Sequence, residues 1–202
     1  MDKIDLRNYN ILILAAGTGS RIGKRGKKLP KSLFEIREKK IIDYLFELLI
    51  KKQVKKINIM TGYKSILIKN YLKKYKKIKI FYKNINNYSK NGHSFTWYKF
   101  KQLWKNSRKS TILFHADILF SEKYLDNLIK SNYENIIGIK KITKKLDKEI
   151  FYISEDKLFV KKISKIPNIT KPIGEVIGIN KISYQLMRKI FLFMDNYFKN
   201  KK

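Results

Sequence analysis

The sequence contains no cysteine among its 202 residues, which excludes disulfides and metal sites with thiolate ligands. It also lacks a long apolar run near its start, because ILILAA at residues 11–16 is too short for a signal-peptide core or a membrane span. We therefore expect a soluble, cytoplasmic protein with no membrane partner. Acidic residues are scarce: 16 aspartates and glutamates stand against 47 lysines and arginines, and the formal net charge is +31 at pH 7.

Nucleic-acid binding is the first function that this charge suggests. However, 41 of the 47 basic residues are lysines, and they are spread from Lys3 to Lys202 rather than gathered in one segment. Arginine, which makes bidentate contacts to phosphates and bases, occurs only six times. Lysine, isoleucine and asparagine dominate together, as in proteins encoded by AT-rich genomes. The composition therefore favours genomic drift, and nucleic acid is not expected as a partner.

The order of apolar patterns predicts the fold class. Hydrophobic residues make up 44% of the sequence, enough for a packed core. Strands are predicted at 10–15, 56–61, 78–82 and 110–115, alternating with helices at 41–52, 64–74, 94–105 and 121–130. Further strands at 135–140, 150–154, 158–164 and 175–179 precede a closing helix at 182–198. This order predicts an α/β fold of Rossmann-like type, with a mixed, mostly parallel sheet flanked by helices. We expect one domain over 1–202, with its core at 9–131 and a β-rich part at 132–202.

The turn after the first predicted strand is the first place to look for a ligand, because open α/β sheets bind ligands beyond the carboxyl ends of their strands. Gly17 and Gly19 would let main-chain N–H groups approach a phosphate, with Arg21 and Lys31 in reach of the same anion. The spacing of the glycines fits neither a Walker A loop nor a G-x-G-x-x-G dinucleotide fingerprint. A glycine turn in a basic loop that binds nothing is the alternative.

A longer string is more specific than the turn. The segment LAAGTGSR at residues 14–21 is followed by PKSL at residues 30–33. Both segments and their spacing resemble the pattern L-A-A-G-x-G-[ST]-R, followed by P-K-x-[LM], of the nucleotidyltransferases that make sugar nucleotides and CDP-activated alcohols. The resemblance is strongest to the phosphocholine and 2-aminoethylphosphonate cytidylyltransferases of that family.

Further segments extend this resemblance over residues 9–190. Thr61-Gly62-Tyr63 resembles a segment that the family places near the base, and NGHSF at 91–95 resembles one that opens a helix beside the nucleotide. His115-Ala116-Asp117 resembles the family's [GA]-D, in which the aspartate binds magnesium. GEVIGI at 174–179 resembles a strand of the cytidylyltransferase branch. The resemblance implies a sheet of the nucleotide-diphospho-sugar transferase type.

The same resemblance implies an enzyme that transfers CMP from CTP to a small phosphomonoester or phosphonate, such as phosphocholine, and releases pyrophosphate. Its product would be a precursor of a surface polysaccharide or lipid. Arg21 would hold the β- and γ-phosphates, Lys31 would offset charge on the α-phosphate, and Asp117 would hold Mg²⁺. Glu175 would lie on the acceptor side, and His115 is expected to pack rather than to act in catalysis. Nucleotide contacts are implied for Leu14, Ala15, Ala16, Gly17, Thr18, Gly19, Gly62, His93 and Ser94.

The C-terminal part departs from the family pattern. Members usually continue beyond the GEVIGI strand to a second acidic residue that completes the metal site, whereas this sequence ends at Lys202 after one predicted helix. Asp195 lies inside that helix pattern and is a poor substitute, so the C-terminal part is expected to be shortened. Three alternatives stay open: the chain is a fragment, the gene is truncated, or another carboxylate such as Glu175 contributes, with Mg²⁺ relying more on phosphates and waters. The missing strand would leave apolar surface that a homodimer contact could cover.

Two other functions stay open at this point. A sugar-1-phosphate thymidylyl- or uridylyltransferase would use the same residues, although the L-T-x-x-x-P-K variant common in that branch is absent. A catalytically impaired remnant that binds nucleotide, or a basic nucleic-acid binder, would fit the charge and the short C-terminal part.

Overall fold

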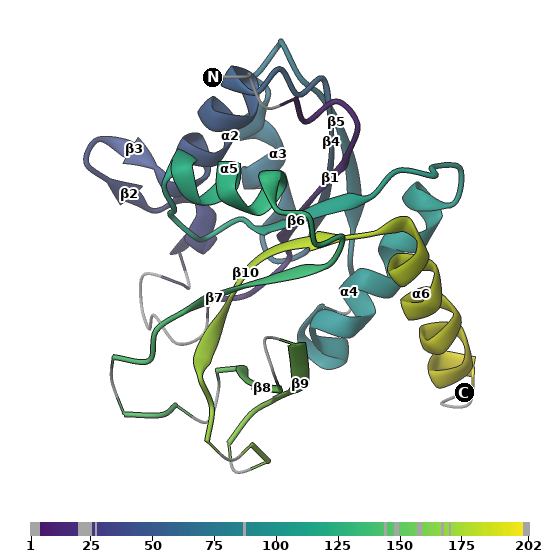
Figure 1. Ribbon diagram of the computed structural model, residues 1–202. Helices are drawn as coiled ribbons and strands as arrows, with labels where there is room; N and C mark the ends of the chain where they lie inside the picture. The colour runs from purple at the N-terminus through teal and green to yellow at the C-terminus, as the bar shows by residue number, and fades with distance from the viewer. Residues whose placement is uncertain are drawn as a thin grey trace.

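The fold is built on a mixed β-sheet (Figure 1). The structure is a computed structural model that describes residues 5–19, 26, 28–86, 88–143, 145–147, 150–156, 159–166, 168–169 and 171–199, without the side chains of 88–93, 155–156 and 199. Eight strands of this described part form one sheet in the order β5-β4-β1-β6-β10-β8-β9, with β7 also paired to β10. A separate two-stranded hairpin joins β2 (Glu35–Ile36) to β3 (Lys39–Lys40).

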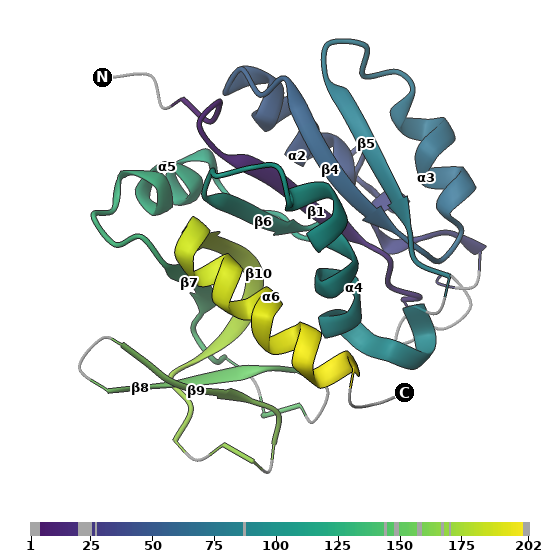
Figure 2. The ribbon, with the colours of Figure 1, turned by 90° about the vertical axis from the view of Figure 1, so that its right-hand side faces the viewer.

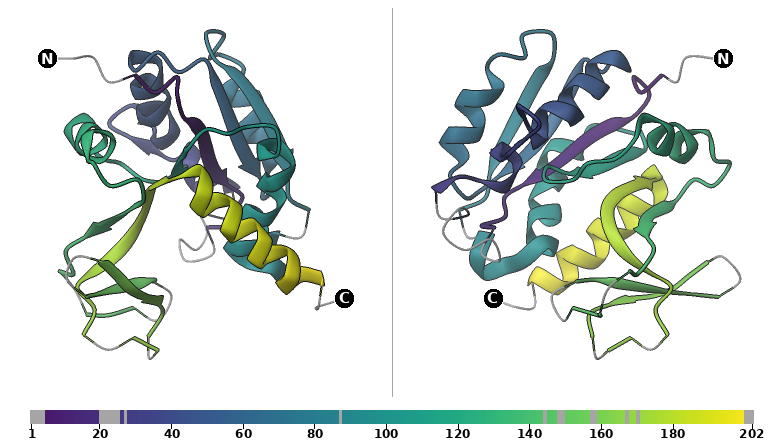
Figure 3. Two further views of the ribbon diagram at one scale, coloured as in Figure 1. Left: turned by 45° about the vertical axis from the view of Figure 1, so that its right-hand side comes forward. Right: turned by 90° about the vertical axis from the view of Figure 1, so that its left-hand side faces the viewer.

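The first half of the sheet is parallel and the second half is antiparallel. The parallel strands are β1 (Asn10–Ala15), β4 (Lys56–Thr61), β5 (Lys79–Asn84) and β6 (Thr111–His115). The long strand β10 (Gly174–Ile182) runs antiparallel to β6 and pairs in turn with β7 (Ile136–Lys140) and β8 (Tyr152–Asp156). The edge strand β9 (Phe159–Ser164) pairs with β8. Figure 3 shows these later strands extending away from the helix-covered part of the sheet.

Helices cover both faces of the parallel half, as the alternation of strands and helices predicts. One face carries α2 (Ile41–Lys51), α3 (Ser65–Leu72) and α5 (Glu122–Lys130), whose apolar residues form a core cluster with Ile11 and Ile13 of β1. The other face carries α4 (Tyr88–Trp104) and α6 (Tyr184–Lys199), which lie side by side (Figure 2) and pack with Leu12 and Leu14. Alternate residues of β1 therefore enter two separate cores.

Most element predictions are confirmed, and the predicted start of one helix is wrong. The bounds predicted for β1 and β4 match the structure, and Ser121 caps α5 by accepting a hydrogen bond from the Tyr124 N–H. Helix α4, however, begins at Tyr88 rather than at Ser94. Asparagine and glycine at 91–92 look like a helix break, but they cost only about 1 kcal/mol inside a helix, and packing of the other turns can outweigh that. No described helix is long and apolar enough to span a membrane.

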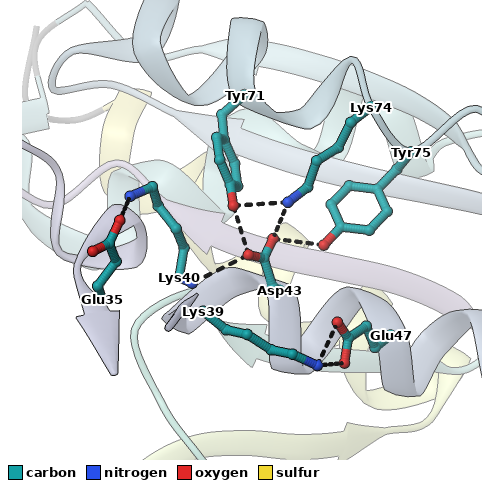
Figure 4. A network of polar contacts seen from close by, with 8 residues as sticks. All are labelled: Glu35, Lys39, Lys40, Asp43, Glu47, Tyr71, Lys74 and Tyr75. Atoms are coloured by element: carbon teal, nitrogen blue, oxygen red, sulfur yellow. Dashed lines mark hydrogen bonds and ion pairs between the residues drawn. The ribbon is translucent and has the colours of Figure 1, made fainter. Parts of the chain in front are cut away.

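A buried carboxylate joins α2 to α3 (Figure 4). Asp43 is only 5% exposed and accepts hydrogen bonds from the Tyr71 hydroxyl at 2.5 Å and the Tyr75 hydroxyl at 2.6 Å. The Lys74 ammonium lies 2.9 Å away, and the Lys40 N–H donates at 3.1 Å. Burial raises the pKa of Asp43, but the hydrogen bonds from Tyr71, Tyr75, Lys74 and Lys40 outweigh it, and the net pKa is lowered. The charged form is therefore the one that this network stabilises.

We expect Asp43→Asn to lower the free energy of unfolding by about 3 kcal/mol at pH 7, because a neutral amide leaves the Lys74 and tyrosine donors poorly paired. A lowered pKa in the folded state contributes stability above the unfolded-state pKa of about 3.9, and that contribution is lost as pH falls through the folded-state pKa. The difference between parent and variant should therefore shrink between pH 5 and pH 3 in urea titrations.

Glu47→Gln is the matched control, because Glu47 pairs with Lys39 in an exposed ion pair at 2.8 Å. It should change the free energy of unfolding by less than about 0.5 kcal/mol at pH 7. An Asp43→Asn effect that stayed the same size from pH 7 to pH 3 would contradict the role given to the charged carboxylate.

Candidate active site

Three loops meet at one edge of the sheet. Because β1, β4 and β6 are parallel, their carboxyl ends lie at the same edge, and each is followed by a segment that the sequence singled out. Main-chain hydrogen bonds join these segments: the Tyr63 N–H donates to the Ala16 carbonyl at 3.2 Å, and the Ala116 N–H donates to the Leu14 carbonyl at 3.0 Å. The structure therefore brings together the turn after β1, the TGY segment and the HAD segment.

A lysine and an aspartate face each other at this edge. The Lys31 ammonium lies 3.6 Å from the Asp117 carboxylate, and the two side chains are 23% and 35% exposed. The aliphatic stem of Lys31 passes over Gly19, where a Cβ atom would lie 3.1 Å from the Lys31 Cγ. Gly19 has a φ of +67°, a conformation that favours glycine. Three of the predicted site residues thus form one contact group although they are distant in sequence.

The segment around Lys31 is fixed from both sides. Pro30 precedes a short 3₁₀ helix, Lys31–Leu33, and the Phe34 N–H donates to the Lys31 carbonyl at 3.0 Å. The Ile41 N–H at the start of α2 then donates to the Phe34 carbonyl at 2.9 Å. Leu33 is buried in the core beside α2. The lysine therefore sits on a tight turn that is anchored to a helix and to the core.

The two glycines of the turn differ in their surroundings: the main chain of Gly17 is open to solvent, whereas Gly19 is packed against neighbouring residues. Leu14, Ala15 and Ala16 are buried, whereas Gly17 is exposed and a Cβ atom there would meet nothing within 4 Å. At Gly19, by contrast, the stem of Lys31 and the main chain of Gly26 lie close. The turn can therefore offer main-chain N–H groups to a ligand near Gly17 while its other end is held in place.

Several predicted site residues are placed otherwise or lie outside the described part. Arg21 is outside the described residues, and so is the side chain of His93, although its backbone belongs to α4. Ser94 is an exposed residue within α4. The prediction that NGHSF opens a helix is wrong, because α4 begins at Tyr88 and the segment lies inside it. Gly62 directly follows β4 at the site edge.

The two other carboxylates considered for the metal are both engaged in ion pairs. Glu175 lies opposite Lys140 in the β10–β7 pairing, with 2.7 Å between its Oε2 and the lysine Nζ, and its side chain is 8% exposed. Asp195 lies on α6 and pairs with Lys101 of α4, so it links the two helices. Both carboxylates therefore have a structural role, because each forms an ion pair that links two secondary-structure elements.

One contact at the site was not predicted from the sequence. The Lys64 side chain donates to the Lys28 carbonyl at 3.0 Å, which ties the loop before Pro30 to the start of α3. Lys64 has a φ of +47°, in the left-handed region that non-glycine residues seldom adopt. A single lysine among 41 gives no signal of such a role in the sequence.

The described residues offer a divalent metal one carboxylate at this edge. No group of three or more histidine, aspartate or glutamate side chains that could hold a metal occurs in the part of the chain that the structure describes. Asp117 follows β6 and is partly exposed. Mg²⁺ commonly takes one or two carboxylates and fills its other positions with phosphate oxygens and waters. The site therefore suits a metal ion that arrives with a phosphorylated ligand.

Comparisons with known proteins identify a matching family model and similar relatives. The model of the family described as "Nucleotidyl transferase" matches residues 10–151. CTP:phosphoglutamine cytidylyltransferase of Campylobacter jejuni is 31% identical over 200 residues, which cover 92% of this chain and 78% of the relative. Choline-phosphate cytidylyltransferase of Streptococcus pneumoniae is 26% identical over 125 residues, 62% of this chain and 52% of the relative.

Solved structures confirm the predicted fold. The inositol-1-phosphate CTP transferase from T. maritima superposes with a TM-score of 0.72 at 15% identity, covering 93% of this chain and 74% of that one. The CTP:phosphocholine cytidylyltransferase from Streptococcus pneumoniae gives a TM-score of 0.71 at 22% identity, covering 96% of this chain and 79% of that one. At these identities the likeness shows the architecture.

The two glycines of the turn provide a test of the site geometry. Gly19→Ala should lower the free energy of unfolding by about 1–2 kcal/mol, because the new methyl group meets the stem of Lys31 and φ is positive. Gly17→Ala is the matched control, since its methyl group would enter open space, and it should change stability by no more than about 0.5 kcal/mol. Denaturant unfolding of both variants measures the difference. Equal losses would contradict the contact between Gly19 and Lys31.

Proposed function

Because the chain belongs to the nucleotidyl transferase family, we propose that it is a cytidylyltransferase, which transfers CMP from CTP to a small phosphomonoester or phosphonate and releases pyrophosphate. The observation that carries the proposal is the contact of Lys31 with Asp117 beside the glycine turn. The choice of CTP is supported by relatives whose names specify CTP:phosphoglutamine and choline phosphate. The product would be an activated precursor for a surface polysaccharide or lipid.

In the proposed reaction, an oxygen of the acceptor's phosphate or phosphonate attacks the α-phosphorus of CTP in line with the departing pyrophosphate. A new O–P bond forms, the bond between the α-phosphorus and the α,β-bridging oxygen breaks, and the electron pair leaves with pyrophosphate. Such a transfer asks the protein mainly for positioning and for stabilisation of charge. The main-chain N–H groups of Gly17, Thr18 and Gly19 would receive the triphosphate.

The two basic residues of the motif, Lys31 and Arg21, would contact different phosphates of CTP. Lys31 would lie against the α-phosphate and offset the charge that grows on its equatorial oxygens in the transition state. Its anchored turn suits this task, because an ammonium group held in place needs no reorganisation when the charge develops. Arg21 would hold the β- and γ-phosphates and stabilise the leaving pyrophosphate, as the motif suggests.

Asp117 would hold Mg²⁺ at the site edge, and the metal when bound would neutralise part of the charge on the phosphate oxygens. A single carboxylate fits this proposal, because phosphates and waters can supply the remaining ligands. Glu175 would act on the acceptor side as part of its ion pair with Lys140. Gly62, His93 and Ser94 would lie near the nucleoside, and Leu14, Ala15 and Ala16 would lead into the turn.

The test is pyrophosphate release from CTP and Mg²⁺ with phosphocholine, phosphoglutamine, 2-aminoethylphosphonate, inositol 1-phosphate and glucose 1-phosphate. Lys31→Met and Asp117→Asn should each lower kcat/KM by about 100-fold or more, since each removes a charge that faces the reacting phosphates. Lys161→Met is the matched control, because Lys161 is an exposed lysine of β9 and should keep parental turnover.

Competition between nucleotides separates the alternatives. Turnover that prefers UTP or dTTP with glucose 1-phosphate would replace the cytidylyltransferase proposal with a sugar-1-phosphate enzyme. If no acceptor is turned over, and Lys31→Met and Asp117→Asn bind CTP as tightly as the parent does, the proposed function is wrong.

A further inference from the structure

A histidine stands in the row of residues that crosses the sheet at the site edge. His115 is the last residue of β6 and lies opposite Leu14 of β1 in the parallel pairing. On its other side, Phe114 pairs with Ile179 of β10, so the next position along β10, Gly178, lies beside His115. The histidine is half-buried between the strand that leads into the glycine turn and the long antiparallel strand.

The imidazole of His115 occupies the space that a side chain at position 178 would fill. A Cβ atom at Gly178 would lie 2.4 Å from Cγ, 2.6 Å from Nδ1 and 2.8 Å from Cδ2 of His115, so the ring covers the glycine Cα. Gly178 has a φ of +77° and lies within the register shift of β10 between Val176 and Asn180. Both the close approach and the backbone conformation require glycine here. The local backbone is thus fitted to the ring.

The side of the sheet on which His115 lies follows from strand alternation. Leu113 of β6 packs in the core cluster beneath α4 and α6, as do Leu12 and Leu14 of β1. His115 is two residues beyond Leu113 and therefore lies on the same face, toward the end of the sheet that Asp117 also occupies. The imidazole stands between the glycine turn on β1 and the antiparallel half of the sheet.

This place suits a contact to the acceptor rather than to the nucleotide. On the proposed function, on which this inference rests, the triphosphate occupies the turn at 17–19 and Lys31. An in-line attack then brings the acceptor's phosphate from the side opposite the departing pyrophosphate. His115 lies between β1 and β10, so a phosphate that approaches from the antiparallel half of the sheet would pass it. An imidazole has two ring nitrogens, so one of them can donate to a phosphate oxygen while the other keeps a contact within the protein.

We propose that His115 determines acceptor binding by donating a hydrogen bond to the phosphate or phosphonate group of the acceptor, with Gly178 holding the ring in place. The proposal assigns His115 a binding task, and it leaves the reaction steps to the residues described above. The sequence predicts only that His115 packs or forms a hydrogen bond, and the structure shows that Gly178 is where the ring packs, which fixes it for this contact.

The experiment uses the full chain and separates acceptor binding from nucleotide binding. His115→Leu removes the donor at similar volume, and it should raise KM for the best acceptor about ten- to a hundredfold. The Kd for CTP, measured by calorimetry without acceptor, should stay within about twofold. His115→Gln, which restores an N–H donor, should recover part of the acceptor KM.

Gly178→Ala is a second, independent variant, because its methyl group would displace the imidazole, and it should give the same split between acceptor KM and CTP Kd. Ile179→Val is the matched control: it shortens a buried side chain one position away, so it should lower Tm while leaving acceptor KM unchanged. An unchanged acceptor KM in His115→Leu, or a rise in CTP Kd equal to that in KM, would overturn the inference. Absence of turnover by the parent, together with unchanged CTP binding in Lys31→Met and Asp117→Asn, would instead overturn the proposed function, and this inference with it.

Discussion

The parallel pairing of β1 on both of its edges is the constraint on which the rest of the structure depends. β1 contributes alternate residues to two separate cores, so any shift of one residue in its register would exchange the buried faces. The same pairing with β4 and β6 brings the ends of three strands to one edge. The turn after β1, Gly62 and Asp117 lie together because the core permits no other arrangement. The position of the site therefore follows from the packing of apolar residues.

Most lysines of this very basic chain are solvated, but a few at that edge are held in fixed positions by their neighbours. Lys31 stands out among the lysines because Pro30, the 3₁₀ turn and the bond from Ile41 fix its backbone, and because Gly19 and Asp117 fix its side chain. A partly exposed ion pair contributes little to stability, so the contact matters chiefly for position. On the proposed function, an incoming phosphate would take the place of Asp117 as partner of the ammonium, and a metal ion would take the place of Lys31 as partner of the carboxylate. On the proposed function, the pair holds both charges where phosphates would bind.

The sequence predicts the parts of this arrangement that depend on local pattern. The bounds of β1 and β4 follow from apolar runs that end at Gly17 and Gly62. The nearness of Lys31 to Asp117 is implied by the family resemblance of their two segments. The remaining features depend on contacts between distant elements, which periodicity does not show. The start of α4 at Tyr88 and the Asp43 network between α2 and α3 are of this kind. The pairing of Glu175 with Lys140 likewise depends on strand register.

The sheet changes from parallel to antiparallel pairing at β10, and its two halves differ in how they would serve the proposed site. On the parallel side, short connections and regular register hold the turn at 17–19 and the residues near Lys31, so that part can vary little without disturbing the core. On the antiparallel side, β10 shifts register between Val176 and Asn180, and β7 and β8 pair with it beyond the helix-covered region. Irregularities of this kind occur beside active sites, where they re-aim side chains. If the nucleotide binds on the first side and the acceptor meets the second, acceptor choice can change while the nucleotide turn stays the same. His115 lies where the two sides join, and its contact with Gly178 depends on the irregular strand, so the acceptor contact proposed for it belongs to the antiparallel side.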